Sequence, residues 1–213
     1  MGKDIVESKM EDVRNELRSR MTPVYLTEDG VLCDLLMPEG YYIGETRNGL
    51  RHGRGTMYYS DGKTCNGDWA NGQANGDVDL KSKDGKTIYK GQMVNGLANG
   101  KGVMVNARTR QYYEGEFKDS VYHGYGRLYN SNKELLYEGF WEEGKQSGHG
   151  TSYVGGKRSY EGDWKNGRPD GQGTSFGENG AVLYSGEWKE GGAADKGSRI
   201  NKAAKEAIDN KKQ

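Results

Sequence analysis

The chain has 213 residues, the length of one domain or of one repeat array. Its 31 Lys and Arg residues balance its 31 Asp and Glu residues, and this zero net charge argues against a basic nucleic-acid-binding surface. With 35 glycines, 15 tyrosines and few aliphatic residues, the composition favours a thin β-structure with frequent turns over a thick aliphatic core.

No stretch of the sequence is apolar enough to span a membrane, and the charged N-terminus lacks the apolar core of a signal peptide. The two cysteines, Cys33 and Cys65, form no Cys-x-x-Cys pair. We therefore expect a reducing, intracellular and cytoplasmic location, with association to the cytoskeleton or to a membrane left open.

Residues 1–22 are predicted to form an amphipathic helix, because apolar residues recur every three or four positions among charged ones. The apolar stripe consists of Val6, Met10, Val13, Leu17 and Met21. Two interpretations stay open: the helix caps the first edge of a sheet, or it recruits a partner helix.

Residues 23–41 are interpreted as a degenerate first hairpin that caps the array. Asp29-Gly30 is a turn signal, and Cys33 follows Gly30 at the distance at which Cys65 follows Gly62. This places Cys33 and Cys65 in the same register with two strands between them. Three strand spacings, about 14 Å, are too far for a disulfide, so we expect none.

Residues 42–191 contain a repeat of 23 or 24 residues, with about six full copies and a truncated seventh. Position +2 of each copy is always glycine, position +4 is mostly large and apolar, and positions +7, +11 and +13 are mostly glycine. Position 0 is occupied by Tyr42, Cys65, Tyr89, Tyr113, Tyr137, Tyr160 and Tyr184.

Each copy is predicted to be a β-hairpin. Tyr160, Gly162 and Trp164 alternate with polar residues, as in a half-buried strand, and Asn166-Gly167 then forms a tight turn. The +14 and +16 residues share one face of a second strand. The +7 and +11 glycines are interpreted as turn residues, and the +2 glycine as space for an aromatic ring from the adjacent strand.

Residues 192–213 are predicted to form a C-terminal tail or helix with a positive net charge. Ser198 is a candidate N-cap, followed by Ile200, Ala203 and Ala207 on the helix. This segment either packs on the last hairpin or attracts an acidic partner or anionic lipid.

The repeat resembles the MORN repeat (membrane occupation and recognition nexus). The segment Tyr160-Glu-Gly-Asp-Trp-Lys-Asn-Gly167, followed by Gly171-Gln-Gly173, is similar to the consensus of that family. The sequence departs from the pattern at Cys65 and Val78 in the second copy and at Ser120 in the fourth.

The resemblance implies an all-β repeat array, a single-layer twisted antiparallel sheet of tandem hairpins with a groove. The residues of the flanks add short N- and C-terminal helices to this expected fold. Similar arrays serve as scaffolds, dimerisation modules and partner-binding grooves, and lipid binding has been proposed for some. No catalytic residue belongs to the repeat itself.

We therefore expect a non-enzymatic scaffold or adaptor that binds a peptide or helix of a protein partner along an aromatic groove, in a cytoskeletal, ciliary or membrane-associated assembly. The alternatives are a phospholipid-tethering module and a regulatory subunit of a larger enzyme complex. Self-association through terminal repeats or helices is also open. The candidate partner-binding residues are Tyr129, Tyr137, Trp141, Tyr153, Tyr160 and Trp164.

Signals for other chemistry are weak, and we expect no cofactor, metal site or nucleic-acid partner. The Gly62-Lys63-Thr64 segment resembles the end of a P-loop, but Met57 stands where that motif needs its first glycine. The three histidines have no chelating spacing. No arrangement of catalytic residues is recognisable.

Overall fold

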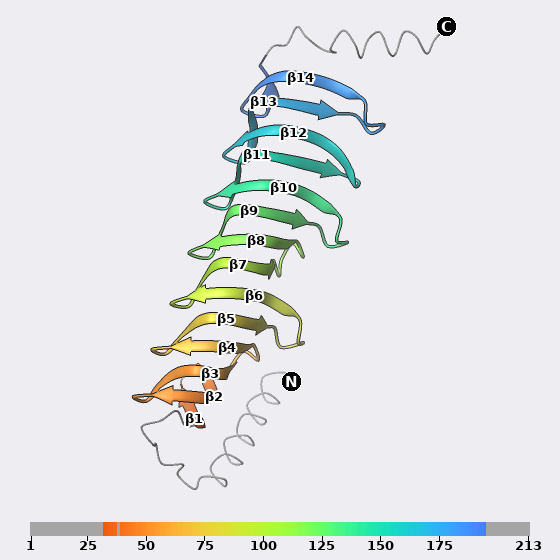
Figure 1. Ribbon diagram of the computed structural model, residues 1–213. Helices are drawn as coiled ribbons and strands as arrows, with labels where there is room; N and C mark the ends of the chain where they lie inside the picture. Colours follow the sequence, from red (N-terminus) through yellow and green to blue (C-terminus); the bar gives the residue numbers. More distant parts are fainter. Residues whose placement is uncertain (1–31, 38, 195–213) are drawn as a thin grey trace, which may run out of the picture.

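The computed structural model describes residues 32–37 and 39–194, which form one open antiparallel sheet of fifteen strands (Figure 1). The strand order in the sheet is the order in the chain, so each strand pairs only with its sequence neighbours. The strands lie in a single layer, which confirms the predicted all-β repeat array. The helices predicted within residues 1–22 and after Ser198 lie outside the described residues.

The fifteen strands are β1 (Leu32–Met37), β2 (Gly40–Arg47), β3 (Leu50–Tyr59), β4 (Thr64–Ala70), β5 (Gln73–Lys81), β6 (Thr87–Val94), β7 (Leu97–Val105), β8 (Tyr112–Lys118), β9 (Val121–Tyr129), β10 (Leu135–Glu142), β11 (Lys145–Val154), β12 (Lys157–Lys165), β13 (Arg168–Phe176), β14 (Val182–Lys189) and β15 (Gly192–Ala193).

The first hairpin, β1 and β2, differs in register from the sequence interpretation. Leu35, and not Cys33, lies opposite Tyr42 at position 0, and Cys33 lies opposite Gly44. The reason is that β1 runs antiparallel to β2 and so takes the place of a second strand of a repeat. The strands β2 and β3 separate β1 from β4, which carries Cys65.

The turn after position +5 has the same backbone conformation in every copy. Asn166 and Gly167 have φ angles of 51° and 80°, the two positive values of a type I′ hairpin turn. The fourth copy keeps this conformation without glycine, because Asp119 and Ser120 also have positive φ. The predicted role of the +7 glycine is therefore confirmed.

The +11 glycines lie in β-bulges rather than in turns, which corrects their interpretation from sequence. Between the pairs Gly162–Gly173 and Trp164–Pro169, the second strand contains two more residues than the first. Gly171, inside this bulge, has a φ of 116°. The carboxylate of Asp163 at position +3 accepts a hydrogen bond from the backbone N–H of position +12 and closes the bulge.

The +2 and +13 glycines face each other at the centre of the hairpins, as Gly115 and Gly126 do, except in the second copy, where Val78 lies opposite Gly67. A Cβ atom added to Gly126 would lie 2.2 Å from the hydroxyl oxygen of Tyr113. The ring that covers the +2 glycine, Gly115, therefore comes from position 0 of its own strand and not from the adjacent strand, as the sequence suggested.

The glycine pair gives a stability prediction. Gly126→Ala should lower the free energy of unfolding by about 2 kcal/mol or more, because the added methyl group displaces the Tyr113 ring. Urea unfolding measures the change. The matched control is Gly192→Ala, where an added Cβ meets nothing closer than 3.8 Å. Equal effects of the two substitutions would contradict this account of the glycine pair.

Candidate functional site

One face of the sheet, here called the ring face, carries a ladder of aromatic rings that is interrupted only where Cys65 and Met93 replace rings. The Tyr137 ring packs edge-on against Trp141 of its own copy and against Trp164 of the next, with both centroid distances 5.1 Å. Tyr160 repeats the pattern with Trp164 and Trp188. Edge-to-face contacts at this distance are favourable, so each ring joins two neighbouring copies.

The tyrosine and tryptophan rings of the ladder also hydrogen-bond to the backbone. The Tyr137 hydroxyl donates to the carbonyl oxygen of Phe140, at position +3 of its own strand, over 3.0 Å. The Trp164 indole N–H donates to the carbonyl oxygen of Gly150, at position +13 of the preceding copy, over 3.0 Å. These bonds recur in the array and fix both the tilt of the rings and the contact between copies.

Four of the six candidate partner-binding residues belong to this ladder. The exposed fraction is 1% for Tyr137, 5% for Trp141 and 4% for Tyr160, and Trp164 is half-buried. The rings of these residues are packed against one another, which corrects the expectation that they form an exposed groove. They hold the repeats together and form the core of the array.

The opposite face, here called the charged face, carries positions +1, +3, +12, +14 and +16. The pairing across the hairpin decides this division: Tyr137 at position 0 lies opposite Ser152 at +15, so the next residue, Tyr153, points to the other side. The candidate residues Tyr129 and Tyr153 therefore lie on the face opposite the other four. The structure does not bring the six together.

Tyr129 and Tyr153 are half-buried on the charged face. The Tyr153 hydroxyl donates a 2.6 Å hydrogen bond to Glu138, and burial together with this bond raises the pKa of Tyr153 to about 12. The Tyr129 ring packs against Tyr112, with a centroid distance of 5.4 Å. Both residues thus combine an aromatic surface with a polar end.

A pair of exposed rings on the charged face was not among the candidate residues. Tyr125 and Phe140 lie opposite each other on β9 and β10, with their centroids 5.8 Å apart. The exposed fractions are 43% and 50%. They occupy positions +12 and +3, which are polar in the other full copies, and this departure was the available sequence signal.

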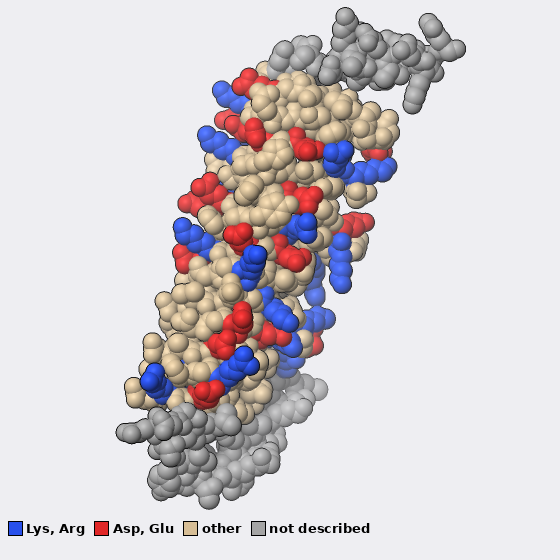
Figure 2. Space-filling model, in the orientation of Figure 1, with Lys and Arg blue, Asp and Glu red and all other residues tan. Residues whose placement is uncertain are grey.

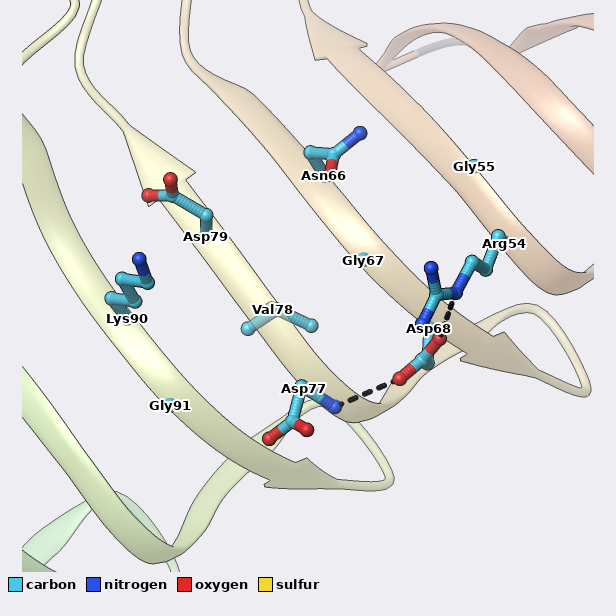
Figure 3. Close-up of a pocket in the computed structure, with 10 residues that line it drawn as sticks. All are labelled: Arg54, Gly55, Asn66, Gly67, Asp68, Asp77, Val78, Asp79, Lys90 and Gly91. Atoms are coloured by element: carbon cyan, nitrogen blue, oxygen red, sulfur yellow. Dashed lines mark hydrogen bonds and ion pairs between the residues drawn. The ribbon is translucent and has the colours of Figure 1, made fainter.

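Two shallow depressions lie side by side on the charged face, and Lys90 and Gly91 line both. One has a volume of about 730 Å³ and contains the exposed ring of Tyr125. The other has a volume of about 720 Å³. Its lining includes Asp68, whose carboxylate accepts a hydrogen bond from the backbone N–H of Asp77 (Figure 3). Together they form a trough that crosses several strands.

The depression lined by Tyr125 has basic side chains on one side and acidic side chains on the other. Lys90 and Lys101 come from β6 and β7, and Glu114 and Glu116 come from β8 beside them. Arg127 lines the same depression and is paired with Glu138 over 3.2 Å. Charges of both signs also alternate over the whole face that Figure 2 shows.

Residues 32–37 and 39–194 contain no group of three or more His, Cys, Asp or Glu side chains that could hold a metal ion. Nor do these ranges include a helix that is long and apolar enough to cross a membrane.

A family model described as the MORN repeat matches five segments of the chain, which together make up just over half of it. The matched segments are residues 42–64, 89–107, 113–133, 137–158 and 160–182. The second copy, which departs from the pattern at Cys65 and Val78, is not among them. A comparison with curated proteins gives no match.

The ladder predicts loss of stability at high pH. Burial raises the pKa of Tyr89 and of Tyr160 to about 12, above the ordinary value of about 10. Their contribution to the free energy of unfolding is therefore complete below about pH 10 and decreases as the pH rises from about 10 to about 12. The decrease is measured by urea unfolding at several pH values across this range, with tyrosinate absorbance as the signal.

The control is Tyr160→Phe. It removes one titrating hydroxyl and its 2.9 Å bond to the carbonyl oxygen of Asp163, so it should lower stability near neutral pH by about 1 kcal/mol. Its stability should then fall less steeply than that of the parent protein above about pH 10. Identical slopes would contradict the assignment of the pH dependence to the ladder.

Proposed function

The chain belongs to the MORN-repeat family, and from this we propose that it is a non-enzymatic scaffold that binds a protein partner along the charged face of its sheet. MORN repeats generally mediate interactions with proteins or membranes. The proposal assigns binding to the trough and to the rings beside it, and assigns cohesion to the ladder on the opposite face.

The exposed Tyr125–Phe140 pair is the observation that carries this proposal. Large apolar surface is uncommon on an otherwise polar face, and exposed aromatic side chains are enriched at the centres of protein interfaces. The two rings lie edge to face and are held by β9 and β10, so little side-chain entropy is lost when a partner covers them. Tyr129 and Tyr153 extend the aromatic surface on the same face.

The charges around the rings suggest how a partner is oriented. A segment lying across β6 to β8 meets Lys90 and Lys101 first and then Glu114 and Glu116. We infer a partner with acidic residues over the lysines and basic residues over the glutamates, since such complementarity fixes register and disfavours other ligands. An extended segment or a helix fits this description.

The location and the wider assembly follow from the same proposal. We place the protein in the cytoplasm, in a cytoskeletal, ciliary or membrane-associated assembly, as one part of a larger complex. Tethering to anionic phospholipid is the weaker alternative. Such tethering is favoured by clustered basic residues, whereas the charges on the face in Figure 2 alternate in sign.

The binding prediction uses the double variant Tyr125→Ser with Phe140→Ser. Partners enriched with the parent protein in quantitative affinity purification should be lost with this variant. The dissociation constant for a purified partner should rise about tenfold or more, because the two rings supply the apolar centre of the interface. The melting temperature should change little, since both side chains are exposed.

The matched control is Val154→Ser with Leu183→Ser, which removes two apolar side chains exposed by 72% and 53% away from the trough. It should retain the partner. Equal binding by both double variants would refute the proposed surface. If the parent protein instead floats with anionic vesicles and Lys90→Glu with Lys101→Glu abolishes flotation, the phospholipid alternative is the correct one.

A further inference from the structure

The type I′ turns of the hairpins form a continuous rim along one side of the sheet, on the left in Figure 1. Successive turns are joined by hydrogen bonds: the N–H of Gly96 donates to the carbonyl oxygen of Ala74, and that of Ser120 to Ala98. The rim is therefore a regular surface whose side chains come from positions +5 and +8 of each copy.

In one half of the array the rim carries four large exposed apolar side chains, two of them paired with Arg47 and Lys118. Leu50 on β3, Val94 on β6, Leu97 on β7 and Val121 on β9 are 44% to 48% exposed. Val94 and Leu97 lie directly opposite each other. Positions +5 and +8 are each one residue from a ring-face position, so these side chains point to the charged side of the rim. We call these four residues the apolar rim.

The other half of the rim is charged. From the fifth copy on, the same two positions pair Glu142 with Lys145, and then Lys165 with Arg168. Figure 2 shows the change, with basic and acidic side chains along the upper left edge and few along the lower left edge. Single exposed apolar residues need no explanation, but four large ones on three of the first four hairpins, with none at these positions in the later ones, indicate a covered surface.

We infer that the apolar rim is the docking site of the chain's own N-terminal segment, residues 3–21. The sequence predicts an amphipathic helix there, and its apolar stripe has no assigned partner. Two independent geometric facts select this segment as the occupant: the point at which the chain joins the sheet, and the length of the segment. The inference does not depend on the proposed function.

The chain enters the sheet at Leu32, on the side of the sheet that carries the apolar rim. Leu32, the first residue of β1, lies opposite Glu45, next to the first type I′ turn and so at the rim end of the strands. Leu50 on β3 is two strand spacings away, about 10 Å. Residues 22–31 can span up to about 33 Å when extended, so Met21 can reach Leu50 with length to spare.

The length of residues 3–21 as a helix also agrees with the length of the apolar rim. A helix of the nineteen residues 3–21, as the sequence predicts, is about 27 Å long at 1.5 Å per residue. The apolar rim runs from β3 to β9, six strand spacings or about 29 Å. A helix that begins beside Val121 and ends beside Leu50 therefore covers the whole apolar rim and stops where the charged half begins. Its stripe of five apolar residues would supply the missing contacts.

Hydrogen–deuterium exchange of the full chain tests the inference. Peptides from residues 3–21 should exchange roughly tenfold or more slowly than an unstructured segment, because docking stabilises the helix. The variant Val94→Ser with Leu97→Ser should remove this protection and leave the exchange of β10 to β14 unchanged. Leu17→Ser, on the predicted stripe, should have the same effect.

The control variant Lys145→Ser with Arg168→Ser changes the charged half of the rim and should leave residues 3–21 protected. Absence of protection in the parent protein would overturn the inference. So would protection that survives the Val94→Ser and Leu97→Ser changes, since the segment would then cap the first edge of the sheet. Protection that increases with protein concentration would place the segment on a second copy, and would overturn docking within one chain.

Discussion

The sheet depends on one repeated contact, a tyrosine ring lying over two facing glycines of its own hairpin. Without side chains, Gly115 and Gly126 let the two backbones and the Tyr113 ring approach within van der Waals distance. The ring then reaches the carbonyl oxygen of Glu116 with its hydroxyl. A single-layer sheet has no second layer to bury its rings, so its own backbone serves as the other wall of the core.

This contact also gives the two faces of the sheet different roles. Once Tyr137, Trp141 and Tyr160 are enclosed by backbone and by each other, they have almost no surface left for a ligand. Binding on the charged face, as proposed, would use side chains that do not decide whether neighbouring copies hold together. Substitutions there can alter binding with little effect on cohesion, which is the property expected of a scaffold that is adapted to different partners.

The sequence allowed the fold to be predicted well and the candidate site poorly, for one physical reason. The spacing of glycines and tyrosines defines the hairpins and their order, and Asn-Gly pairs define the turns. The side of the sheet to which the second strand's residues point follows from the two-residue turn, which pairs +5 with +8 and so places the odd positions of the second strand on the ring face. The two extra residues of the bulge leave this unchanged, but the residues at +16 had been grouped with the even positions of the first strand. Tyr129 and Tyr153 were therefore assigned to the wrong face, whereas Tyr125 and Phe140 could have been found as aromatic residues at polar positions.

The strand order has a consequence for the way this protein is made. Because every strand pairs with the one before it, each hairpin has its partner already in place when it leaves the ribosome. No part of the described sheet waits for a distant segment of chain, so the loop-closure entropy that slows most β-proteins stays small at each step. The array can grow one hairpin at a time, and a copy gained or lost by duplication of its coding sequence would change the length of the product without disturbing the folding of the remainder.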